Sequence, residues 1–152
     1  MKAKVYFFTH YLRVEEIVAN TEKEHIEACQ EMLEAGRELK FVLSAVADFA
    51  ESIVMLFIGV SISMEHEDIY MNMHSMRKQK GLFIVSPPNL GGGRMKIENG
   101  ELHFFSSSYS MGPYSECMLK KAEVDIKEKF GIDSVHYSTD YIASELGRRF
   151  SL

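Results

Sequence analysis

The chain has 152 residues, of which 46% are hydrophobic and 26% charged, as in an ordinary single folded domain. Its net charge of −5, without a lysine- or arginine-rich run, argues against general nucleic-acid binding, which requires a basic surface. The two cysteines, Cys29 and Cys117, provide neither a disulfide framework nor a zinc-ligand spacing, so we expect a reducing, cytoplasmic setting.

The first segment predicts a strand followed by a helix. Residues 5–8 form a short strand-like run, and the beginning of the chain is too short and polar for a signal peptide. Residues 21–24 match a capping box, and residues 26–33 then present one apolar face that ends before Gly36. A start near Arg13 would instead give a longer helix.

Two apolar strands are expected next, at residues 40–46 and 53–62. The second is apolar on both faces, which predicts a central position in the sheet. Asp48 and Glu51 fall in the predicted turn between them. These two charges divide the apolar region 41–62 into two uncharged segments. Neither segment reaches the roughly 20 residues that a helix needs to cross a bilayer, so we expect no membrane span.

His66 lies where the second strand ends and a helix to about Lys80 is predicted to begin. The first backbone N–H groups of a helix have no intrahelical partner, and the helix dipole favours an anion there. His66 is therefore a candidate base beside a phosphate site. The alternative is a solvated first-turn histidine flanked by Glu65, Glu67 and Asp68.

The second half of the chain continues with alternating strands and helices. The expected elements are a strand at 82–85, a hairpin turned by Asn99-Gly100, a polar loop at 106–113, a helix from about Ser115 to Phe130, a strand at 135–137, and a final helix capped by Thr139 or Asp140. This order predicts a single-domain α/β sandwich with a mixed β-sheet and helices on its faces.

Two further segments could bind an anion. The glycines before Arg94 would let a backbone approach a ligand closely, although a bulge or tight turn is the simpler interpretation. The serine-rich residues 106–110 could offer hydroxyl and N–H groups, although they also suit a plain turn. The sequence contains no P-loop and no Gly-x-Ser-x-Gly elbow. His66 and His74 lack companions for a metal site, and His103 fits a sheet histidine.

Three segments together resemble the phosphohistidine phosphatase (Janus) family. His66-Glu67-Asp68-Ile69-Tyr70 is similar to the family's catalytic-histidine segment, and Leu90-Gly91-Gly92-Gly93-Arg94 is similar to its glycine-rich turn. Residues 103–113 are similar to its strand and phosphate loop. The segments occur in the family's order, and the resemblance covers roughly residues 40–137. It implies a Janus-like fold for the single domain 1–152.

The resemblance implies a metal-independent, cofactor-free phosphatase that acts on phosphohistidine or another phosphoramidate. His66 would be the general base that activates water, with a nucleophilic role as the competing idea. The implied phosphoryl and substrate contacts come from Lys40, Glu67, Arg94, Ser108, Tyr109 and Ser110, through backbone N–H groups of the helix start and loop, the Ser108 hydroxyl and the two cations. The implied partner is a phosphorylated protein or a small phosphorylated ligand, with no nucleic acid or membrane; the oligomeric state stays open.

Four features depart from the family pattern. Ile58 stands where members carry a basic residue, and Glu67 replaces a small neutral residue. Residues 1–38 form an N-terminal extension without a counterpart, and Lys2 or Lys4 could open the equivalent strand instead of Lys40. These departures keep two alternatives open: a non-catalytic module of the same fold that binds a phosphorylated ligand, nucleotide or peptide, and an α/β interaction protein.

Overall fold

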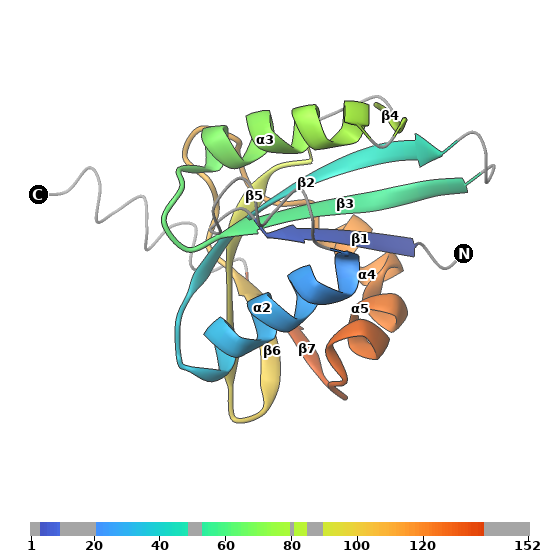
Figure 1. Cartoon of the computed structure of the whole chain (residues 1–152). Helices are drawn as coiled ribbons and strands as arrows, with labels where there is room; N and C mark the ends of the chain where they lie inside the picture. Colours follow the sequence, from blue (N-terminus) through green and yellow to red (C-terminus); the bar gives the residue numbers. More distant parts are fainter. Residues whose placement is uncertain (1–3, 10–20, 49–52, 80, 85–89, 139–152) are drawn as a thin grey trace, which may run out of the picture.

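The computed structural model describes residues 4–9, 21–48, 53–79, 81–84 and 90–138, which form a mixed α/β fold (Figure 1). The strands in these ranges are β1 (Lys4–Thr9), β2 (Leu39–Asp48), β3 (Ile53–Ser61), β4 (Phe83–Ile84), β5 (Gly92–Glu98), β6 (Glu101–Phe105) and β7 (Val135–Tyr137). The helices there are α2 (Glu22–Glu34), α3 (His66–Gln79), α4 (Glu116–Lys121) and α5 (Glu123–Phe130).

The strands join in one mixed sheet in the order β1-β3-β2-β5-β6-β7, and β4 pairs with the remaining length of β2. The β1–β3 and β6–β7 pairs are parallel, whereas the other pairs are antiparallel. The expected mixed sheet and the central position of β3 are confirmed. Only the start of β3 departs from the expectation of full burial, because Val54 is exposed.

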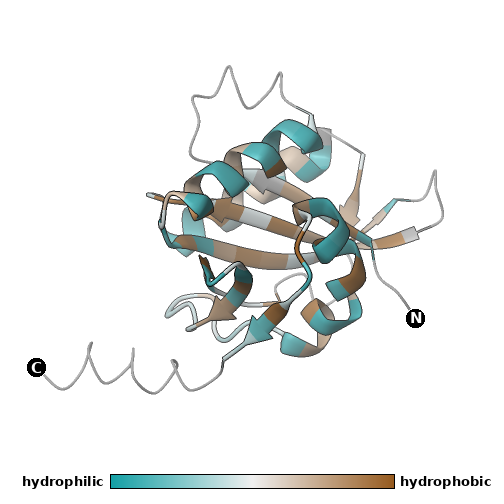
Figure 2. Ribbon diagram, turned by 90° about the horizontal axis from the view of Figure 1, so that it is seen from below, coloured by the Kyte–Doolittle hydropathy of each residue, from teal (hydrophilic) through white to brown (hydrophobic). Residues whose placement is uncertain are grey.

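Helices cover both faces of this sheet (Figure 1). On one face, α3 packs Ile69, Met73 and Met76 against Val42 and Phe57 of the strands. On the other face, α2, α4 and α5 cover a larger core that contains Phe7, Phe41, Leu43, Ile58 and Phe104. Figure 2, seen from this side, shows largely hydrophobic strands beneath helices that carry many hydrophilic residues. Each fully buried large apolar side chain contributes about 1.5–3 kcal/mol.

Local sequence signals account for most element boundaries. The capping box is present, since Thr21 Oγ1 accepts from the Glu24 N–H and the Glu24 side chain accepts from the Thr21 N–H. Asn99 and Gly100 both have positive φ, as a two-residue hairpin turn requires. The alternative helix start near Arg13 lies outside the described residues, as does the final helix at 139–152.

The prediction of one continuous helix at residues 115–130 is wrong. The structure has two helices there, α4 and α5, which meet at Ala122. The φ of −95° and ψ of 0° at Ala122 lie outside the helical region. Its apolar residues repeat every four positions, so a straight helix would turn them by about 40° per repeat away from the sheet. The break lets Leu119 and Ala122 as well as Ile126 and Phe130 remain buried.

Two further boundaries differ from expectation. Asp48 is the last residue of β2 rather than part of the turn, and the rest of that turn lies outside the described residues. The strand after the hairpin, which the sequence predicts from Leu102 to about Ser107, ends at Phe105. In the described part of the chain, no helix is both long and apolar enough to cross a membrane.

Candidate functional site

The candidate site forms where the first turn of α3 meets strands β2 and β5. Lys40 of β2 and Arg94 of β5 are direct cross-strand partners. Because side chains alternate along a strand, Lys40 shares the face of Val42, which packs with the α3 core. His66 opens α3 beside these strands. Three sequence-predicted residues that are far apart in the chain therefore meet on the α3 side of the sheet.

A strand carbonyl fixes the His66 imidazole. Its Nε2 lies 2.9 Å from the Gly93 carbonyl oxygen, and only 8% of the residue is exposed. A carbonyl oxygen can only accept, so Nε2 must carry the hydrogen and donate it. In the neutral imidazole, Nδ1 is then the nitrogen that can accept a proton.

Burial lowers the pKa of His66 below its ordinary value of 6.5. The charges of Lys40 and Arg94 lower it further, whereas the hydrogen bond to Gly93 and the charge of Glu65 act in the opposite direction. The net lowering keeps the ring neutral near pH 7, the form in which a histidine can act as a base. The contacts place both cations near the ring, because Lys40 lies 3.6 Å from Glu65, the residue before His66, and Arg94 directly follows Gly93.

The glycine run brings the serine loop onto β5. A Cβ atom on Gly92 would lie 2.6 Å from the Phe41 carbonyl oxygen, 3.1 Å from His66 Cδ2 and 3.4 Å from Ser108 Cβ. His66 and Ser108 thus both lie against a position that tolerates no side chain. Gly91 has a φ of +84°, and a Cβ there would collide with the Pro113 carbonyl. The glycines therefore serve close packing of protein segments, rather than only the predicted approach of a ligand.

Ser108 is engaged differently from the expectation for a phosphate loop. Its N–H donates to the Gly92 carbonyl over 2.9 Å, so this group is already used inside the protein. Its Oγ accepts from the Met111 N–H at 2.9 Å and lies 3.4 Å from Ser110 Oγ. The expectation that the Ser108 N–H holds a phosphoryl group is therefore corrected. Ser108 is only 2% exposed, and its hydroxyl stays a prediction as a phosphoryl contact.

The remaining predicted binding residues lie at the surface. Glu67 is exposed in the first turn of α3, and Tyr109 and Ser110 are exposed in the loop after Ser108. Tyr109 has 60% of its surface exposed. These three positions remain predictions as substrate contacts.

The two site cations have carboxylate partners that the sequence interpretation missed. Lys40 Nζ lies 3.6 Å from Glu65 Oε1, and Arg94 Nη1 lies 3.6 Å from Glu38 Oε1. Sequence proximity offered a signal for Glu65, which directly precedes His66. Nothing comparable marks Glu38 as a partner of Arg94, because that contact depends on the β2–β5 register.

Ile58, the position of the expected basic residue, does not face this site. It is fully buried with the core on the α2 side of the sheet. A charged side chain there would point into that core, so in this fold the absence of a basic residue at 58 does not remove a cation from the His66 side.

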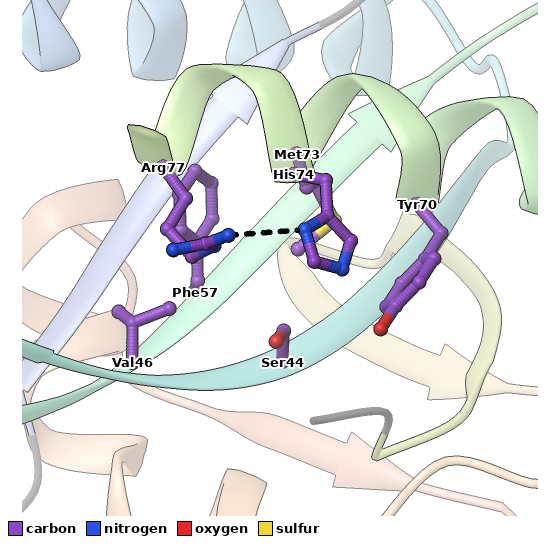
Figure 3. Close-up of a pocket in the computed structure, with 7 residues that line it drawn as sticks. All are labelled: Ser44, Val46, Phe57, Tyr70, Met73, His74 and Arg77. Atoms are coloured by element: carbon purple, nitrogen blue, oxygen red, sulfur yellow. Dashed lines mark hydrogen bonds between the residues drawn. The ribbon is translucent and has the colours of Figure 1, made fainter. Parts of the chain in front are cut away.

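A separate small pocket lies farther along α3, lined by apolar as well as polar side chains (Figure 3). Tyr70 and His74 point from the helix toward β2, and the Arg77 guanidinium is directed at His74, with its Nη2 3.3 Å from His74 Nδ1. The cavity volume is about 10 Å³, enough for about one water molecule. Burial, followed by the charges of Arg77 and Lys78, lowers the pKa of His74. The pocket is too small for a phosphoryl group.

The described residues contain no group of three or more histidine, cysteine, aspartate or glutamate side chains placed to hold a metal ion. Comparison with protein-family models gives no match, and no curated protein matches at a significant level.

Proposed function

We propose that this protein is a metal-independent phosphatase of the phosphohistidine type, with a Janus-like fold. The observation that carries the proposal is His66: a buried imidazole, oriented by the Gly93 carbonyl, with its pKa lowered and with Lys40 and Arg94 nearby. The resemblance of the three sequence segments supports the same function.

In the proposed reaction, water attacks the phosphorus atom of a phosphohistidine while His66 Nδ1 takes a proton from that water. The P–N bond breaks, and the leaving imidazole nitrogen gains a proton from solvent. Lys40 and Arg94 stabilise the charge on the phosphoryl oxygens, which is the main task of a catalyst for phosphoryl transfer. The competing pathway transfers the phosphoryl group to Nδ1 first.

The test measures phosphate release from a phosphohistidine peptide by the wild type and by His66→Ala. Loss of a general base should reduce the rate by roughly 10²–10⁴-fold. His74→Ala is the matched control, because it removes a histidine from the same helix outside the site, and it should retain activity. Absence of turnover by the wild type would contradict the proposal.

A non-catalytic phosphoryl-binding module on the same scaffold is the second candidate. It is favoured by the pairing of Lys40 and Arg94 with glutamates and by the engaged Ser108 N–H, which leave fewer groups to stabilise a transition state. Binding of a phosphorylated peptide to the wild type by calorimetry, without phosphate release, would support this alternative.

A further inference from the structure

Each cation of the proposed site carries a carboxylate that an incoming phosphoryl group must displace or accommodate. Glu65 contacts Lys40 and Glu38 contacts Arg94, each over 3.6 Å. The cation side chains are 22% and 35% exposed, whereas those of Glu65 and Glu38 are 74% and 48% exposed. The cations are therefore the more enclosed members of both pairs, and the glutamates form a rim toward solvent.

The rim carboxylates come from two separate segments. Glu65 is the residue before α3, and its carbonyl accepts the N–H of Ile69 in the first turn of that helix. Glu38 directly precedes β2, two residues before Lys40. Because Lys40 and Arg94 are cross-strand partners, the two glutamates accompany neighbouring cations.

A bound phosphoryl group would compete with both glutamates. Its negative charge attracts Lys40 and Arg94, and it repels the two carboxylates that these cations now neutralise. A substrate that brings its own positive charges beside the phosphoryl group would supply Glu38 and Glu65 with replacement partners. An acidic substrate would add to the repulsion.

We infer, on the basis of the proposed phosphatase function, that the site selects a phosphorylated peptide with basic side chains flanking the phosphoryl group, through Glu38 and Glu65. These glutamates are specificity-determining residues at the rim. They act by charge on the parts of the substrate beside the reacting group, while Lys40 and Arg94 act on the phosphoryl group itself.

The experiment compares kcat/KM for three phosphohistidine peptides of equal length, flanked by lysine, glutamine or glutamate. Measurement at pH 8 keeps His66 neutral in all variants. The wild type should prefer the lysine-flanked peptide over the glutamine-flanked one, and the glutamine-flanked peptide over the glutamate-flanked one. Each rim glutamate should change kcat/KM by up to about fivefold, the scale of an exposed ion pair. The preference should shrink in high salt because the charges are screened.

Substitutions at Glu38 and Glu65 test whether these rim glutamates cause the preference for the lysine-flanked peptide. The double substitution E38Q/E65Q should abolish most of it, and Glu65→Lys should favour the glutamate-flanked peptide. The matched control is Glu128→Gln, which removes one exposed carboxylate from α5 on the opposite face of the sheet and should retain the wild-type preference. Inorganic phosphate should also bind E38Q/E65Q more tightly than the wild type in calorimetry.

The outcomes separate the inference from the function on which it rests. Equal hydrolysis of the three peptides by the wild type would overturn the inference and leave the phosphatase function standing. A preference that survives in E38Q/E65Q, or phosphate affinity that fails to rise in that variant, would overturn the role of the glutamates. No phosphate release from any peptide would overturn the proposed function and the inference with it.

Discussion

At the residue scale, opposite charges around one imidazole make its ionisation a direct test of the site geometry. Lys40 lowers the pKa of His66, whereas Glu65 raises it. Lys40→Gln should therefore raise the pKa of His66 and Glu65→Gln should lower it, as measured by NMR titration of the ring Cε1–H. Glu128→Gln should leave it unchanged. Shifts in the same direction for both site variants would contradict the described arrangement.

Ser106 carries local strain beside the serine loop. Its φ is +64°, it is fully buried, and its Oγ has no hydrogen-bond partner among the described residues. Ser106→Gly should relieve about 1–2 kcal/mol of left-handed strain and an unsatisfied hydroxyl, against about 0.5–1 kcal/mol of added entropy in the unfolded chain. We expect a net stabilisation of about 1 kcal/mol by urea unfolding.

The neighbouring serine provides the control for this prediction. Ser107 is absent from the positive-φ residues of the described chain, so Ser107→Gly gains no strain relief. It should destabilise the protein by about 0.5–1 kcal/mol through the entropy of glycine alone. Equal effects of the two substitutions would show that left-handed strain at Ser106 is not the cause.

The sequence predicted the principal site residues but not the hydrogen bonds that they make within the protein. His66 could be assigned to a helix start because an apolar strand and a helical repeat adjoin it. The bond from the Ser108 N–H to Gly92 could not be predicted, because it depends on how a loop folds back over β5. Tertiary packing decides which N–H groups are consumed, and no local pattern encodes that choice.

At the element scale, β1 forms one edge of the sheet, and side chains from the helices satisfy its outward N–H groups. Val5 donates to Asp125 Oδ2 at 2.8 Å, Phe7 to Glu22 Oε2 at 2.9 Å and Thr9 to His25 Nδ1 at 3.2 Å. An unpaired strand edge is a template for association with another chain. Here α2 and α5 cover that edge with hydrogen-bond acceptors.

Glu22 is the acceptor whose removal best tests this cover. It binds the Phe7 N–H and also pairs with Lys129 Nζ at 2.9 Å. Glu22→Ala should destabilise the fold by about 1–3 kcal/mol, because it leaves a strand N–H without its partner. Glu22→Gln retains an acceptor oxygen and should cost less, as measured by urea unfolding. Equal losses would indicate that the charge, and not the hydrogen bond, matters.

The sequence predicted the types of the helices and strands, but it did not predict that one helix is divided in two. The capping box at Thr21 and the Asn99-Gly100 turn are short-range signals with one structural solution each, and both are confirmed. The break at Ala122 arises from the need to keep a four-residue apolar repeat against the sheet. The mismatch follows from the repeat itself, but the position of the break depends on how the helix packs on the sheet, which the apolar pattern does not contain.

At the scale of the whole molecule, two hydrophobic cores of different size lie on opposite faces of one sheet. The larger core, under α2, α4 and α5, holds most of the buried apolar residues, whereas the α3 core is smaller. The candidate site lies on the α3 side, where β2 and β5 present Lys40 and Arg94. The sequence predicted a mixed α/β sandwich, but the assembly of the site required the strand order, which places β5 beside β2.

Buried His66 also links the stability of the whole chain to pH. Its pKa is lowered in the folded state, so below about pH 6.5 the unfolded chain binds the proton more readily than the native protein. The stabilisation is fully present above the unfolded pKa and is lost as the pH falls toward the lowered folded pKa. The wild type should therefore lose more unfolding free energy between pH 7.5 and 5.5 than His66→Gln.

Urea unfolding at the two pH values measures this difference for each protein. His74 also has a lowered pKa but is less buried, so His74→Gln should flatten the pH dependence less than His66→Gln does. Because the comparison is between slopes, a constant loss of stability caused by either substitution does not affect it. An equal pH dependence in the wild type and His66→Gln would mean that His66 titrates alike in the folded and unfolded chains. It would then lack the lowered pKa that the proposed base requires.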